Sequence, residues 1–182
     1  ENVYSGGGPG DDEITSFTLQ SDNRIIICGN FVSDFKWGNR KVTSSGKQDG
    51  FIATLSDSAH CVSLSAYGGV GNDSIDALVN NGGQISIAGS FDNQISFAKE
   101  SFSTKGGRDS YIALLASNGS DVIDAKQLGG GGEDIIEQVH SSMTGHFIVS
   151  GISGGDISKD GSFSSLSLGS QNSYVSFFGP NQ

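Results

Sequence analysis

Three acidic, glycine-rich turns hold the residues of this sequence best suited to chemistry. They read GGPGDDEIT at residues 7–15, GGVGNDSID at residues 68–76 and GGGGEDIIE at residues 129–137. Carboxylates clustered in a loop are typical ligands of Ca²⁺, which takes about six to eight oxygen atoms. A structural interpretation competes with this one, because a carboxylate after a chain reversal can accept backbone N–H bonds and hold the turn. The calcium candidates are Asp11, Asp12, Asp73 and Asp134.

The spacing of these turns argues against a calcium β-roll. The motif matches the nonapeptide of such rolls, but there the copies recur about every nine residues so that each ion sits between adjacent coils. Here Gly7, Gly68 and Gly129 stand 61 residues apart, and copies so distant cannot stack as coils. The turns therefore indicate a long internal repeat, and we expect no cofactor apart from calcium at these candidates.

No other set of residues suggests catalysis. The sequence has three histidines and lacks the HExxH, CxxC, G-x-S-x-G and P-loop patterns. His60 and Cys61 are neighbours, so on a strand their side chains point to opposite faces and form no dyad. We therefore expect a protein that is not an enzyme.

Trp37, the only tryptophan, is a candidate ligand-binding residue within DFKWGNR. If exposed, its ring can stack on a sugar or anchor a partner. If buried, it fills space between repeats. Aromatic residues recur in the same connection of the other repeats, at Phe97, Phe102 and Phe163, which favours packing.

Composition narrows the class of protein further. Glycine is abundant (28 residues), proline is scarce (2 residues), and the net charge is −10. An acidic chain is a poor ligand for nucleic acid or an anionic membrane, since both attract lysine and arginine. No apolar run is long enough to span a bilayer.

The two cysteines, Cys28 and Cys61, are expected on strands separated by one other strand. Their distance is then beyond the reach of a disulfide, so we expect two buried free thiols.

Each repeat contains up to four strand signals. In QISIAGSF (84–91) the alternation of Ile85, Ile87 and Phe91 with polar or small residues predicts a strand with one face more buried. Gly29, Gly89 and Gly151 interrupt the equivalent strands, which suggests a bulge or a close approach of neighbouring backbone. A polar, variable connection follows, and then strands such as DGFIATL and CVSLSAY.

The combinations DGFIATL…LSAYGGVGNDSI and DSYIALL…AKQLGGGGEDII resemble the bacterial β-propeller repeat called SBBP, over about three copies. This resemblance implies a surface or secreted protein without a catalytic role. The third copy departs from the pattern, since Asn172 replaces the aspartate found at Asp49 and Asp109. We therefore predict an all-β fold of three four-stranded antiparallel propeller-type blades.

The repeat boundaries leave both ends unpaired. We assign an orphan fourth strand to residues 1–6, blades to 7–67 and 68–128, and a third blade to 129–182 that lacks its own fourth strand. Three blades are fewer than the roughly four to eight that close a propeller. We therefore expect closure or extension by oligomerisation, or a place within a longer propeller.

The predicted role is a non-catalytic, extracellular structural subunit. It would self-associate head-to-tail into a ring or fibre, by donating its N-terminal strand to the open edge of the third blade. Alternatives are a ligand- or glycan-binding module, or a fragment of a larger surface or adhesion protein with glycans or surface proteins as partners. The expected interface residues are Val3, Tyr4, Tyr174, Val175 and Phe177.

Overall fold

A computed structural model describes residues 3–97, 100–142, 146–155, 158–159, 163–164 and 172–178 of the chain. Within these ranges the protein forms β-strands and no helix, which confirms the all-β prediction. All pairing between named strands is antiparallel, and no sheet closes on itself.

The first sheet contains four strands in sequence order, joined by hairpins. The β1–β2 turn places Asn23 at φ 63°, and the β2–β3 turn places Gly38 at φ 62°, a left-handed conformation that glycine adopts without strain. The strands are β1 (Asp12–Leu19), β2 (Ile25–Trp37), β3 (Arg40–Leu55) and β4 (Cys61–Tyr67).

The second sheet has six strands, in the order β14-β13-β10-β9-β6-β5. Its members β10, β9, β6 and β5 correspond to the four predicted strands, and two short strands extend it beyond β10 through the pairing of Leu128 with Lys159. The prediction of four strands was wrong here, because the exposed edge of β10 offers unpaired N–H and C=O groups to the connection after β12. The strands are β5 (Ala77–Asn81), β6 (Gln84–Phe91), β9 (Asp109–Leu115), β10 (Val122–Gly129), β13 (Ser158–Lys159) and β14 (Phe163–Ser164).

The third sheet has three strands, in the order β11-β12-β15. They are β11 (Asp134–Ser141), β12 (Phe147–Ser153) and β15 (Asn172–Phe178). In the described part of the chain, no strand pairs with the outer edge of β15. A separate two-stranded hairpin is formed by β7 (Gln94–Phe97) and β8 (Glu100–Ser103).

Two predicted segments differ from the structure. The segment DSIDALV (73–79), which the repeat predicts as the first strand after the glycine turn, becomes a strand only at Ala77, although the amides of Ser74 and Asp76 donate to the carbonyls of Ser90 and Ala88. The connection expected to be polar and variable instead continues the strands in the first repeat, where β2 and β3 run on to residues 37 and 40. Its aromatic side chains pack on the sheet, and that packing stabilises the extended hairpin.

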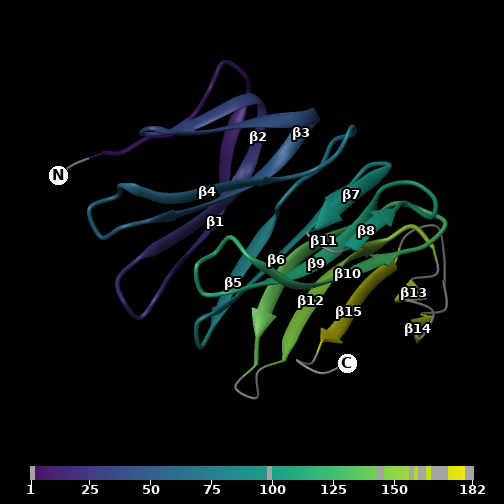
Figure 1. Cartoon of the computed structure of the whole chain (residues 1–182). Helices are drawn as coiled ribbons and strands as arrows, with labels where there is room; N and C mark the ends of the chain where they lie inside the picture. The colour runs from purple at the N-terminus through teal and green to yellow at the C-terminus, as the bar shows by residue number, and fades with distance from the viewer. Residues whose placement is uncertain are drawn as a thin grey trace.

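The sheets pack face to face with the second sheet in the middle (Figure 1). One hydrophobic cluster joins Ile26, Cys28 and Ile52 of the first sheet to residues of the second sheet that include Ile85 and Ile87. Another cluster joins the second sheet to Ile136, Val139, Phe147 and Val149 of the third sheet. Burial of apolar side chains between sheets is therefore the main stabilising interaction of the fold.

The strand glycines lie where backbones approach closely, as predicted. A Cβ atom on Gly29, Gly89 or Gly151 would clash with a carbonyl oxygen of the neighbouring chain segment, that of Glu13, Ser74 or Ile135 respectively. The same contact thus recurs once in each large sheet. Only glycine leaves room for it.

Candidate assembly surfaces

The aspartates of the glycine turns hold those turns by hydrogen bonds. Asp12 accepts a bond from the amide of Gly8 at 2.6 Å, Asp73 from Gly69 at 2.6 Å, and Asp134 from Gly130 at 2.8 Å. The structural role predicted for these carboxylates is confirmed. Asp73 and Asp134 are fully buried, and burial raises the pKa of Asp73 to about 6.

The structure offers little support for calcium at these turns. Asp11 is exposed beside Asp12, and both line an open pocket with Glu13, Asn30 and Gln48. Among the residues that the structure describes, no group of three or more histidine, cysteine, aspartate or glutamate side chains could hold a metal ion. The four calcium candidates are thus spread over three turns.

Trp37 is 7% exposed and belongs to a hydrophobic cluster of the first sheet that also contains Phe31, Phe35 and Phe51. Its indole N–H donates to the carbonyl of Ala59 at 3.1 Å. In the same cluster the rings of Phe35 and Phe51 stack with centroids 4.0 Å apart. This environment corresponds to the packing interpretation of Trp37, because an indole with its N–H satisfied and its ring buried offers little surface for stacking on a sugar.

Both cysteines are free thiols, as predicted. Cys28 is buried between the first and second sheets, and burial raises the pKa of its thiol to about 12. Cys61 is only half-buried, which differs from the expected burial. It lies at the start of β4, which is an edge strand of the first sheet.

Residues 3–6, the described part of the orphan fourth strand predicted at residues 1–6, form no named strand. Val3 is 95% exposed and Tyr4 is 51% exposed, so neither packs into a sheet of its own chain. One isolated bridge anchors the segment, because the amides of Gly7 and Lys36 each donate to the other residue's carbonyl, at 2.9 and 3.1 Å.

This segment nevertheless contacts the first sheet at a position equivalent to the contact between β4 and the β7–β8 hairpin. The repeat aligns Gly6 with Tyr67 and Trp37 with Phe97. The rings of Tyr67 and Phe97 stack with centroids 5.7 Å apart, and Gly6 approaches Trp37 so closely that a Cβ atom would clash with the indole. The first repeat therefore has a glycine against its aromatic ring where the second repeat has a tyrosine.

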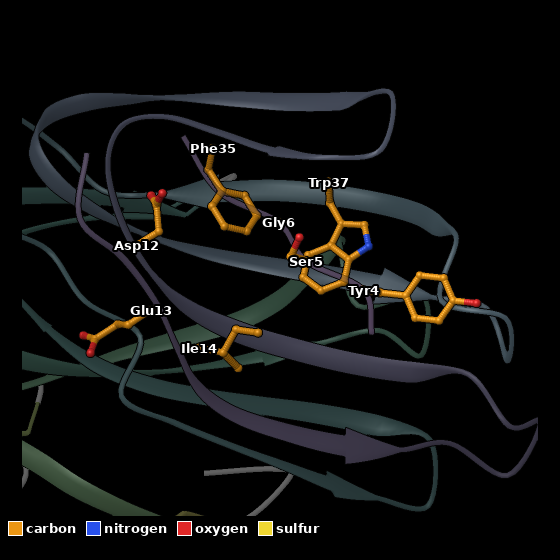
Figure 2. A pocket seen from close by; sticks show the side chains of 8 residues that line it. All are labelled: Tyr4, Ser5, Gly6, Asp12, Glu13, Ile14, Phe35 and Trp37. Carbon is orange, nitrogen blue, oxygen red and sulfur yellow. The ribbon is translucent and has the colours of Figure 1, made fainter. Parts of the chain in front are cut away.

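Next to this contact lies an open pocket of about 270 Å³ (Figure 2). Tyr4, Ser5 and Gly6 form one side of it, and Ile14, Phe35 and Trp37 lie around the remainder with the carboxylates of Asp12 and Glu13. The equivalent of Ile14 in the second repeat is Ile75, which is fully buried against the first sheet. The pocket therefore marks the place where no sheet of the described residues packs ahead of the first sheet.

The other predicted interface residues lie on the edge strand β15. Its backbone pairs with β12, with Tyr174 opposite Gly151, Val175 opposite Ser150, and Phe177 opposite Ile148. Tyr174 packs against the cluster shared with the second sheet, whereas Val175 points away from that sheet and is 62% exposed. The structure places this edge at the opposite end of the molecule from the N-terminus (Figure 1).

Sequence reasoning missed a patch of exposed apolar side chains on β1. Ile14, Phe17 and Leu19 are 52%, 68% and 62% exposed and share the face of the first sheet that points away from the second sheet. The repeat spacing links Ile14 to Ile75 and Ile136. It carries no signal that the first copy lies in water while the other two are buried, because burial depends on which sheet lies opposite.

No protein-family model matches the chain, and no curated protein sequence matches it. The resemblance to the SBBP repeat thus stays a prediction. No helix among the described residues is long and apolar enough to cross a membrane.

Proposed function

We propose that this protein is a non-catalytic, extracellular structural subunit built from three propeller-type blades, and that copies associate head-to-tail. The N-terminal strand of one copy would pair with the third blade of the next. The extracellular setting rests on the resemblance to surface repeats and on the acidic, glycine-rich composition. The proposal requires no cofactor.

One observation carries the proposal. In the first and second sheets a fourth strand follows the third, as β4 pairs with β3 and β10 with β9, whereas β15 ends the third sheet as described. An open edge of this kind is a template for a strand from another chain. Residues 3–6 supply a segment outside every named strand, near the N-terminus at the opposite end of the molecule.

The internal pairs predict the register of the donated strand. Ile52 lies opposite Ser65 and Ile112 lies opposite Lys126. By the repeat, these pairs correspond to Val175 and Tyr4. Opposite residues of antiparallel strands have Cα atoms about 4.5–5.5 Å apart, which is within disulfide reach.

Cross-linking between two chains tests this register. We expect chains carrying Tyr4→Cys to form mixed disulfides with differently tagged chains carrying Val175→Cys, both in a Cys61→Ser background. Val70→Cys, at an exposed turn position, replaces Val175→Cys as the control and should cross-link far more slowly. Equal yields in the two mixtures, or a chain that sediments as a monomer at every concentration, would overturn strand donation.

A further inference from the structure

The two junctions between neighbouring sheets share one construction. In each junction, one face of a sheet, which includes residues of its first two strands, packs against the preceding sheet in the chain. The preceding sheet contributes the face that points toward the later sheet. Phe17 pairs with Ile27, Leu78 with Ile87 and Val139 with Val149, so the three sheets present equivalent side chains in the same register.

No described sheet of the chain packs on this face of the first sheet. We define its leading face as Ile14, Phe17 and Leu19, which are all exposed. The equivalents of Ile14 are Ile75 and Ile136, and the equivalents of Phe17 are Leu78 and Val139, which are all buried within the two junctions. The leading face thus has the chemistry of a junction surface.

The third sheet presents the complementary surface, on which no other described sheet of the chain packs. We define its trailing face as Ile148, Ile152 and Val175, which share one side of β12 and β15. Val175 is 62% exposed, whereas its equivalents Ile52 and Ile112 are buried in the two junctions at 1% and 5%. Ile148 and Ile152 are half-buried.

These two faces lie at opposite ends of the stack of sheets (Figure 1). Because they are different surfaces at opposite ends, a contact between them joins two copies head-to-tail and repeats from copy to copy. Within the chain, β4 completes the first sheet and then leads into the second sheet. If two copies dock in this arrangement, residues 3–6 of one copy lie next to β15 of the other.

We propose that the leading face of one copy docks on the trailing face of a second copy and forms a third junction of the internal kind. This inference rests on the head-to-tail assembly proposed above, and it adds the surfaces that supply the apolar contact. Strand donation by itself requires only backbone pairing at the edge of β15, so the two contacts can be tested separately.

Sedimentation of matched variants tests the docking. Phe17→Ser and Val175→Ser each remove one exposed apolar side chain, and we expect each to raise the dissociation constant of the assembly at least about tenfold. Val70→Ser removes an equally exposed side chain outside both faces and should leave it unchanged. Urea unfolding of each variant should match that of the unmodified chain, because these side chains already lie in water.

Mixing the variants tests the direction of docking. A Phe17→Ser chain keeps its trailing face and a Val175→Ser chain keeps its leading face, so an equimolar mixture should form one intact junction and recover two-chain particles. A leading face that docks on a second leading face would make Phe17→Ser defective and Val175→Ser normal, and two trailing faces that dock would give the reverse; either result would overturn the proposal.

The outcomes separate this inference from strand donation. If Phe17→Ser leaves assembly unchanged and the disulfide between positions 4 and 175 still forms, the docking proposal is wrong and strand donation is supported. Assembly that depends on Phe17 and Val175 without that disulfide retains the docking and overturns strand donation. A chain that stays monomeric throughout overturns both.

Discussion

The leading face of the first sheet and the equivalent face of the second sheet have similar sequences and different surroundings. Ile14 and Ile75 follow the same glycine turn, and each turn is held by an aspartate that accepts an amide bond from the glycine four residues before it. Ile14 is half exposed, whereas Ile75 is fully buried. What separates them is the sheet that precedes Ile75, so the comparison teaches that each repeat is completed by its neighbour.

The comparison has an energetic side. Burying one large apolar side chain stabilises a protein by about 1.5–3 kcal/mol. The second and third sheets obtain this stabilisation from the sheet before them, whereas Ile14, Phe17 and Leu19 leave it unrealised in a single copy. A repeat protein with such an unfinished end gains stability when another sheet covers it.

The largest expected effect comes from truncating the buried member of the pair. Ile75→Ala should lower the free energy of unfolding by about 2–5 kcal/mol, because it leaves a cavity between two sheets. Ile14→Ala should lower it by less than about 1 kcal/mol in the monomer. Urea unfolding at low protein concentration measures both, and equal losses would show that the two faces are alike after all.

A smaller effect is expected from Asn30, which ties the first junction together. Its side-chain oxygen accepts the amide of Ile75 at 2.8 Å, and its nitrogen donates to Glu13 at 3.1 Å. Asn30→Ala leaves the buried amide of Ile75 unpaired and should cost about 1–3 kcal/mol of unfolding free energy.

Glu13→Ala is the matched control for Asn30, because it removes the bond on the exposed side alone. It should change the unfolding free energy by no more than about 0.5 kcal/mol. A loss as large as that of Asn30→Ala would mean that the bond to Ile75 contributes little to the junction.

The smallest expected effect is a pH dependence of the unfolding free energy that arises from the glycine turn held by Asp73. Burial raises the pKa of Asp73 from 3.8 to about 6, so in this range the folded chain binds more protons than the unfolded chain. The free energy of unfolding should therefore fall as the pH rises from about 4 to about 6. Burial also raises the pKa of Asp49, Asp76 and Asp109, which contribute with the same sign.

Asp73→Asn removes one of these titrating groups. Its unfolding free energy, followed by urea titration at several pH values, should decrease less steeply with pH than that of the unmodified chain. An unchanged slope would indicate that Asp73 is as well hydrated in the folded protein as in the unfolded one.

Much of the local structure could be predicted because it depends on neighbours in sequence. The strand around Ile85, the turn role of Asp73 and the close approach at Gly89 all follow from alternation, side-chain length and the absence of a Cβ atom. The β7–β8 hairpin was not predicted, because Ile95 and Phe97 become buried only when Tyr67 and Tyr111 pack nearby.

By itself the sequence determined the all-β class, the positions of most strands and the glycine turns, since these depend on residues close together along the chain. Only the tertiary structure decided that Trp37 is buried, that Ile14 and Phe17 lie in water, and that the third sheet as described ends at β15. The physical reason is that a strand's alternation predicts an apolar face, but the exposure of that face depends on which sheet lies opposite. That partner comes from a distant part of the chain or, as we propose, from a second copy.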